Sequence, residues 1–195
     1  MALFRTVSFA ESVPAIEGDG IVLRTPQMTD FVEWAQLRER SREFLTPWEP
    51  IWPADDLTRS AFRRRLRRYN EDARSDLAYA FFVFRQSDDA LVGGLTLANV
   101  RRGVAQAGSL GYWMGMPFAR QGYMGRAVRA LVPFAFGPLR LHRLEAACIP
   151  TNTASSRLLE KCGFTREGLA RRYLCINGLW QDHYLYALLI TDPRP

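Results

Sequence analysis

A segment near the middle of the chain has the residue types and spacing of an anion-binding turn. A predicted strand ends at Trp113 and Met114, and the turn that follows contains Arg120-Gln121-Gly122-Tyr123-Met124-Gly125-Arg126. A strand that leads into a helix leaves unpaired N–H groups at the helix start, where the helix dipole is positive. Such a start binds phosphate, the glycines let a ligand approach the backbone, and the arginines add charge.

Two common phosphate-binding motifs do not fit this segment. It lacks the GxGxxG spacing of a dinucleotide site and the GKS or GKT ending of a P-loop. On these residues alone, a plain strand-to-helix connection whose glycines serve packing remains the alternative.

Metal binding and disulfide formation are not indicated. His142 and His183 are the two histidines, and they lie far apart without other plausible ligands nearby, so we expect structural roles. The cysteines Cys148, Cys162 and Cys175 are odd in number and show no CxxC spacing, which predicts neither a disulfide framework nor a zinc site. For Cys148 and Cys162 we expect packing roles rather than nucleophilic chemistry.

Composition favours one globular domain. The 195 residues are 48% hydrophobic and 24% charged, a balance that excludes disordered, collagen-like and coiled-coil classes. Arg5 and Glu11 interrupt the first residues, so no secretory signal is predicted, and no uncharged stretch is apolar enough to span a membrane. Together with the cysteine count, these features predict a cytoplasmic protein.

The net charge is +6, and it comes mainly from arginine. Lys161 is the only lysine among 26 basic residues. Because arginine binds phosphate bidentately, this bias suits a phosphate-rich ligand or an RNA-containing partner. A GC-rich genome explains the bias equally well.

The first part of the chain predicts a strand, a helix and a loop. Residues 21–24 alternate as an opening strand. Asp30 and Glu33 have the spacing of a capping box, which predicts a helix start at Asp30. Residues 44–50 are expected to form a loop, since prolines prevent a helix there.

A second helix and a hairpin follow. Residues 56–71 place apolar groups on one helix face and the arginines of Arg63 to Arg68 largely on the other. That basic face is either a solvated surface or a contact for RNA or the ribosome. Residues 79–85 and 91–100 are rich in β-forming residues, and a polar turn between them predicts a hairpin.

The last part of the chain carries the clearest local signals. Gly163 ends a predicted helix, and Asn177-Gly178 lies between two alternating runs, as in a tight hairpin. The predicted elements are strand 110–114, helix 123–136 with Pro133 bending or loosening its last turns, strand 143–149, helix 153–162 and two final strands. This order indicates a mixed α/β sheet with helices packed on it.

From about residue 20 to 188 the chain resembles the GNAT acetyltransferases, and within them the RimJ and RimL ribosomal-protein-alanine N-acetyltransferases. The turn is similar to the family's acyl-CoA pyrophosphate loop, Q/R-x-x-G-x-G/A, but departs from it at Ala119 and Met124; the GYM sequence matches the RimJ/RimL branch. Further similar segments are Phe44-Leu45-Thr46-Pro47-Trp48-Glu49-Pro50, His142-Arg143-Leu144-Glu145, Asn152-Thr153-Ala154-Ser155, Leu159-Glu160-Lys161-Cys162-Gly163-Phe164 and the hairpin 166–183.

The resemblance implies a fold, a domain and a cofactor. The fold would be the α+β GNAT fold, with a mixed central sheet of about six to seven strands, splayed in the middle, and about four helices. One domain would cover 20–190, between an N-terminal extension, 1–19, and a short tail, 191–195. Acetyl-CoA would be the co-substrate, without a metal. Its expected contacts are Trp113, Met114, Arg120, Gln121, Gly122, Tyr123, Met124, Gly125, Arg126 and Asn152.

The implied reaction is direct acetyl transfer to an amine in a ternary complex. An α-amino group has a pKa of about 7.7–8.0, against about 10.4 for lysine, so a protein N-terminus needs little help to become neutral. A carboxylate acting through water would suffice, and Glu145 is the candidate base. A surface or ion-paired role for Glu145 is the alternative.

The departing thiolate needs a proton. Many relatives use a tyrosine at the position of Leu159, so that role does not transfer to this chain. The resemblance implies Ser155 as the substitute acid, with Asn152 holding the cofactor or a water; Asn152 also suits a helix N-cap. Backbone N–H groups near Met114 would polarise the thioester carbonyl.

The acceptor remains open between three hypotheses. Trp48, Glu49, Tyr173 and Trp180 would border the acceptor groove. The first hypothesis is a protein N-terminus, ribosomal or other, beginning with a small residue such as Ala or Ser. The second is a small amine such as an aminoglycoside or polyamine, and the third is a non-enzymatic module that binds RNA or the ribosome through Arg63 to Arg68. The protein is expected to be a monomer or a homodimer.

Overall fold

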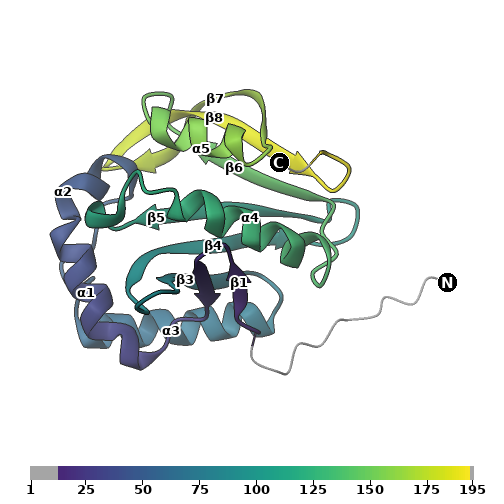
Figure 1. The fold of residues 1–195 in the computed structure, drawn as a ribbon. Helices are drawn as coiled ribbons and strands as arrows, with labels where there is room; N and C mark the ends of the chain where they lie inside the picture. The colour runs from purple at the N-terminus through teal and green to yellow at the C-terminus, as the bar shows by residue number, and fades with distance from the viewer. Residues whose placement is uncertain (1–12, 194–195) are drawn as a thin grey trace.

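The computed structural model describes residues 13–193, and they form an eight-stranded sheet in the order β1-β2-β3-β4-β5-β6-β8-β7 (Figure 1). The strands are β1 Ile16–Gly18, β2 Ile21–Arg24, β3 Tyr79–Arg85, β4 Leu91–Arg101, β5 Ala107–Met114, β6 Arg143–Cys148, β7 Thr165–Ile176 and β8 Leu179–Leu189. The α-helices are α1 Phe31–Arg40, α2 Arg42–Leu45, α3 Arg59–Arg74, α4 Tyr123–Phe136 and α5 Thr153–Lys161. Most of the predicted extension 1–19 and the last residues of the tail 191–195 lie outside the described residues.

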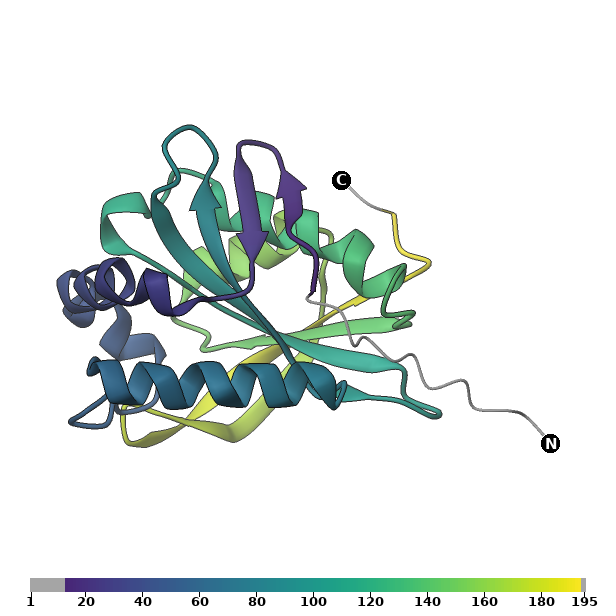
Figure 2. The ribbon, with the colours of Figure 1, turned by 90° about the horizontal axis from the view of Figure 1, so that it is seen from below.

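Helices cover both faces of the sheet, as Figures 1 and 2 show from two directions. Strand β3 explains why: Phe81 and Val83 belong to the core under α4, while Phe82 and Phe84 belong to the core under α1 and α3. A strand that is buried on both faces reads as a continuous apolar run rather than an alternating one. Within the described residues, no helix is long and apolar enough to cross a membrane.

The centre of the sheet opens between β5 and β6. This pair is parallel, whereas the other neighbouring strands are antiparallel. Its paired residues run from Ala107 opposite Arg143 to Leu110 opposite Ala146, although β5 continues to Met114. The two strands therefore separate toward the left of Figure 1, between α4 and α5.

All the predicted strands are present, and one additional strand, β1, was not expected. β1 forms a short hairpin with β2, with Ile16 opposite Leu23, and it lies inside the predicted extension. The closing hairpin is confirmed: Asn177 and Gly178 both have positive φ, 46° and 79°, as a tight two-residue turn requires. Helix α4 begins and ends where the sequence predicts and runs through Pro133, and Gly163, with φ 86°, follows α5.

The capping box predicted from Asp30 and Glu33 is wrong. Asp30 precedes α1 but its side chain makes no cap hydrogen bond; instead its carboxylate accepts from Arg24, at 2.6 and 2.9 Å, and from the backbone N–H of Gln27. Glu33 accepts from the backbone N–H of Leu91, at 2.7 Å. The Asp30 carboxylate thus serves the capping box of the preceding 3-10 turn, Met28–Asp30, rather than that of α1. The contacts of Asp30 with Arg24 and of Glu33 with Leu91 attach α1 to the sheet.

Two further expectations need correction. Residues 44–50 are partly helical: α2 ends at Leu45, and Thr46–Trp48 form a 3-10 turn with Pro47 in its first residues, where a missing N–H costs nothing. The helix predicted over 56–71 is α3, which begins at Arg59 because the Thr58 side chain caps it by accepting from the Ala61 N–H.

Candidate active site

The opening between β5 and β6 is lined from both strands. Tyr112 follows the last paired residue of β5, Leu110, by two positions, and Cys148 follows Ala146 on β6 by two. Because side chains alternate along a strand, these residues share the sheet face that α4 and α5 cover, where Cys148 is part of the core and Tyr112 packs against it. A Cβ added to Gly111 would meet nothing within 4 Å, so the other face of β5 is open here.

Helix α5 places Ser155 at this opening. The hydroxyls of Tyr112 and Ser155 lie 2.8 Å apart, although the two residues are distant in the sequence. The Asn152 side chain accepts from the Ser155 backbone N–H at 3.1 Å, which confirms Asn152 as the N-cap of α5. Burial raises the pKa of Tyr112 above its ordinary value, so the phenol stays protonated at neutral pH.

The start of α4 is the candidate anion site of the sequence analysis. Gly122 is the N-cap with φ 82°, a left-handed conformation that favours glycine. In the described structure no side chain caps α4, and its first turn contains no acidic residue. Arg126 extends over the ring of Tyr123 and donates weakly, at 3.5 Å, to the Gln121 carbonyl. Residues of these types at a helix start are typical of phosphate binding, and a phosphate at this position stays a prediction.

Backbone N–H groups also point into the opening. The Gly115 N–H donates to the Val92 carbonyl on β4 at 2.9 Å. Since successive residues of a strand face opposite neighbours, the N–H groups of Tyr112 and Met114 point away from β4, toward the separated β6. The Trp113 side chain lies on the opposite face from Tyr112, with its ring 6.4 Å from that of Phe82.

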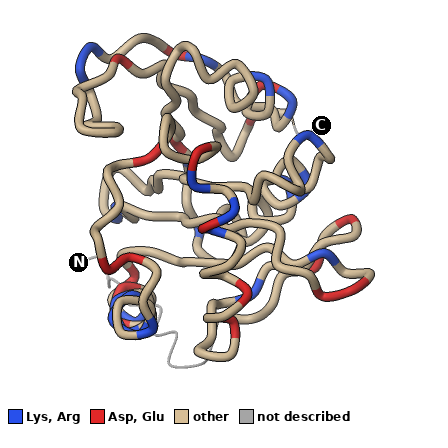
Figure 3. The backbone as a smooth tube through the Cα atoms, turned by 90° about the vertical axis from the view of Figure 1, so that its left-hand side faces the viewer, with Lys and Arg blue, Asp and Glu red and all other residues tan. Residues whose placement is uncertain are grey.

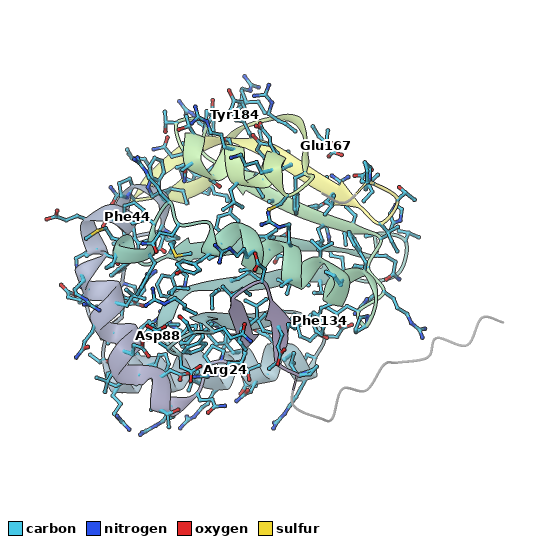
Figure 4. The ribbon with its side chains drawn as sticks, in the orientation of Figure 1. Arg24, Phe44, Asp88, Phe134, Glu167 and Tyr184 are labelled. Atoms are coloured by element: carbon cyan, nitrogen blue, oxygen red, sulfur yellow. The ribbon has the colours of Figure 1, made fainter. Side chains whose placement is uncertain are left out.

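Glu145 is not brought to the opening. It lies opposite Ser109, five residues before Met114, which is about 16 Å along the strand. Its carboxylate accepts from Arg101 at 2.5 Å and from Arg143 at 3.0 Å. Arg143 also donates to Glu167. Glu167 lies at the upper right of Figure 4, whereas α1 and α2 lie on the left. The geometry therefore favours the ion-paired role over that of a base.

The predicted acceptor residues come from two segments that do meet. The Glu49 carbonyl accepts from the backbone N–H of Asn177 at the tip of the β7–β8 hairpin, at 2.9 Å. On that hairpin Tyr173 and Trp180 are 49% and 65% exposed, as a binding surface requires. Trp48 ends the 3-10 turn beside Glu49 and is partly buried. Phe44, at the left of Figure 4, adds a further exposed aromatic ring from α2.

Glu49 itself is occupied by partners that the sequence analysis missed. Its carboxylate oxygens accept from Arg38 at 2.7 and 2.6 Å, and one of them also accepts from the Trp52 indole at 2.7 Å. The Arg38 guanidinium lies 4.0 Å from the ring centre of Trp52 and 5.0 Å from that of Trp113. This buried cluster connects the loop after α2 to β5. Three of the roughly four acceptor positions of the Glu49 carboxylate are therefore taken by the protein itself.

The basic face of α3 is partly neutralised. Arg64 pairs with Asp55 and Arg65 with Asp56, both at 2.5 Å, while Arg63 and the two remaining arginines of the run are exposed. In Figure 3, α3 is seen nearly end-on at the lower left, with basic positions around it. Within residues 13–193, no group of three or more His, Cys, Asp or Glu side chains could hold a metal ion.

A model of the acetyltransferase (GNAT) domain matches residues 21–165. The chain belongs to the GNAT acetyltransferase family. It is a GNAT N-acetyltransferase, and family membership sets aside the hypothesis of a non-enzymatic module.

Relatives cover nearly the whole chain. The probable N-acetyltransferase YjcK of Bacillus subtilis is 38% identical over 91% of this chain and 98% of its own length. The [ribosomal protein uS5]-alanine N-acetyltransferase of Escherichia coli is 32% identical over 96% of this chain and 97% of its own. RimJ of Mycobacterium smegmatis, solved in complex with CoA-disulfide, is 29% identical with a TM-score of 0.85, and covers 94% of this chain and 89% of that one.

These comparisons confirm the predicted fold class and the RimJ-type resemblance. The fold is the α+β GNAT fold, with eight strands and five α-helices in the described residues rather than six to seven strands and four helices. The strand count differs because β1 is too short to give a sequence pattern. The opening between β5 and β6 lies in the middle of the sheet, where the sequence analysis expected the strands to splay.

Proposed function

We propose that this acetyltransferase binds acetyl-CoA with its pyrophosphate at the start of α4 and its thioester in the opening between β5 and β6. Three features support this: the uncapped helix start at Gly122, the arginines beside it, and the N–H groups of Tyr112 and Met114 that face the opening. Acetyl-CoA supplies the activated acetyl group. The residues of the chain orient it and stabilise the charge that develops on the carbonyl oxygen.

The proposed acceptor is the N-terminal α-amino group of a protein, of the ribosomal-protein-alanine type. The observation that carries this proposal is the similarity, at 32% identity over 96% of the chain, to an enzyme named for alanine acetylation of uS5. The exposed rings of Tyr173 and Trp180 and the neighbouring loop with Trp48 would receive the first residues of the acceptor. The exposed arginines of α3 would contact the ribosome.

The proposed proton transfers use Ser155 and water. The acceptor attacks as a neutral amine, and a group with a pKa of about 7.7–8.0 is substantially neutral near that pH without a strong base. Because Glu145 is ion-paired elsewhere, water takes the amine proton. The Ser155 hydroxyl gives a proton to the departing sulfur, and Asn152 holds the first turn of α5 in place.

An acetyl-CoA-dependent mass-shift assay on pooled acceptors tests the proposal. The pool contains Ala- and Ser-starting peptides with free or blocked N-termini, lysine peptides, polyamines and aminoglycosides. We expect one acetyl group on free N-termini, and roughly 100-fold lower kcat for Ser155→Ala, the loss typical of a missing general acid. Modification of small amines in place of peptides would overturn the proposed acceptor.

A further inference from the structure

The contact between Tyr112 and Ser155 has no role in the proposed proton transfers. The Tyr112 hydroxyl lies 2.8 Å from that of Ser155, and it comes from β5 rather than from α5. Each hydroxyl carries one proton and two lone pairs, so only one of the two donates in this hydrogen bond. If Tyr112 donates, the Ser155 proton is left to point elsewhere. The direction of the Ser155 proton therefore depends on Tyr112.

Tyr112 is the favoured donor of this hydrogen bond. A phenol is far more acidic than an aliphatic hydroxyl and hence the stronger donor. Burial keeps the Tyr112 phenol protonated by raising its pKa, so it retains a proton to donate over the neutral range. The Ser155 backbone N–H is already bound by Asn152, which keeps the serine in register with the opening.

The neighbouring polar groups have partners of their own. Cys148 on β6 and Ser156 on α5 lie 3.3 Å apart through their side chains, and the Tyr186 hydroxyl on β8 donates to Glu160 at 3.4 Å. The ionisable groups that act on Tyr112 are the Cys148 and Cys162 thiols and the Tyr186 hydroxyl. The Cys162 thiol in turn accepts from Arg129 at 3.9 Å. In the described structure, Ser155 is thus the hydrogen-bond partner of Tyr112.

We propose that Tyr112 is a positioning residue: it donates to the Ser155 oxygen and so directs the Ser155 proton toward the thioester sulfur. This inference rests on the proposed role of Ser155. The amine nitrogen forms a C–N bond to the acetyl carbonyl carbon and loses one proton to water. As the C–S bond breaks, the sulfur takes the Ser155 proton, and Ser155 regains one from solvent. Tyr112 keeps its own proton throughout.

Tyr112→Phe removes the hydroxyl and keeps the ring. We expect kcat to fall about tenfold with KM for acetyl-CoA unchanged, since a hydrogen bond in the reaction path is lost while binding is not. In the Ser155→Ala background the same change should have no further effect, because the two residues act as a unit. Tyr186→Phe is the matched control: it also removes a buried hydroxyl, but one bound to Glu160, and kcat should not change. Additive losses in the double variant would overturn the proposal.

A second measurement is independent of the acceptor. A serine proton directed at the sulfur stabilises the CoA thiolate, so binding of CoA to the wild-type protein should tighten about tenfold as the pH rises toward the pKa of the free thiol. Tyr112→Phe should abolish most of this tightening, and a CoA analogue without sulfur should show none in either protein. Identical pH curves for CoA in the two proteins would overturn the inference even if no peptide is acetylated, whereas a failed acceptor screen alone counts against the proposed function.

Discussion

At the scale of single residues, the buried ion pair of Arg38 and Glu49 links segments that are distant in the sequence. Its side chains are 7% and 19% exposed, and it lies between the rings of Trp52 and Trp113. Removing one partner of such a pair leaves an uncompensated buried charge. The pair therefore holds the loop after α2 against β5 and against the tip of the β7–β8 hairpin.

Glu49→Gln should destabilise the fold by about 3–5 kcal/mol, because the Arg38 charge stays buried without a counter-ion. We also expect the substitution to raise KM for the acceptor more than KM for acetyl-CoA, since the loop and the hairpin lose their common anchor. Thermal or urea unfolding measures the first effect and steady-state kinetics the second.

Glu39→Gln is the control, because the Glu39–Arg42 pair is 60% and 47% exposed and should contribute less than about 1 kcal/mol. Equal losses of stability in Glu49→Gln and Glu39→Gln would contradict the argument.

At the scale of elements, the start of α4 contains two glycines, and the structure constrains the residue type at these two positions differently. Gly122 has a positive φ, so its backbone conformation alone favours glycine. Gly125 lies within the first turn of α4, and an added Cβ would meet nothing closer than an Arg129 nitrogen at 3.5 Å, an ordinary contact. Folding therefore does not require glycine at 125, which is consistent with the proposed close approach of acetyl-CoA to this turn.

Gly125→Ala should raise stability by up to about 1 kcal/mol, because alanine is the better helix former, while acetyl-CoA binds more weakly. A melting curve and an acetyl-CoA titration of the same sample separate the two effects. If the variant is more stable and binds acetyl-CoA as the wild type does, the ligand does not approach α4 at this residue.

At the scale of the whole molecule, burial of ionisable groups predicts how stability depends on pH. Burial raises the pKa of Tyr79, Tyr112 and Tyr186, and Asp76 adds to the effect at Tyr79; burial also raises the pKa of the Cys162 thiol. A raised pKa means that the folded protein holds the proton more tightly than the unfolded chain. The free energy of unfolding therefore falls as the pH rises above the ordinary values, near 8.5 for cysteine and 10 for tyrosine.

The melting temperature should begin to fall near pH 9 and fall more steeply above pH 10. Tyrosinate absorbance recorded with the unfolding curve should show the buried phenols ionising together with unfolding. Tyr79→Phe should flatten the decline and the exposed Tyr173→Phe should not, so equal slopes in all three proteins would contradict this account.

Local signals were sufficient for much of the fold. Asn177-Gly178 requires positive φ at two successive residues, and Gly163 ends a helix for the same backbone reason. The apolar stripe of α4 and the cap at Asn152 are likewise properties of a few neighbouring residues. The boundaries of these elements and the family resemblance therefore followed from the sequence by itself.

Long-range contacts decided the rest. Asp30 and Glu33 had the spacing of a capping box, but the Glu33 carboxylate accepts from the backbone N–H of Leu91, 58 residues away, and the Asp30 carboxylate accepts from Arg24 and Gln27. The same holds at the site: Ser155 could be named from its motif, whereas its contact with Tyr112 depends on how far β5 and β6 stay paired. The sequence determined which residues form each element and the chemistry they carry. Only the tertiary structure decided which charges neutralise one another and which hydroxyls meet. The physical reason is that most of these partners are far apart in the chain and are brought together by burial of the two cores.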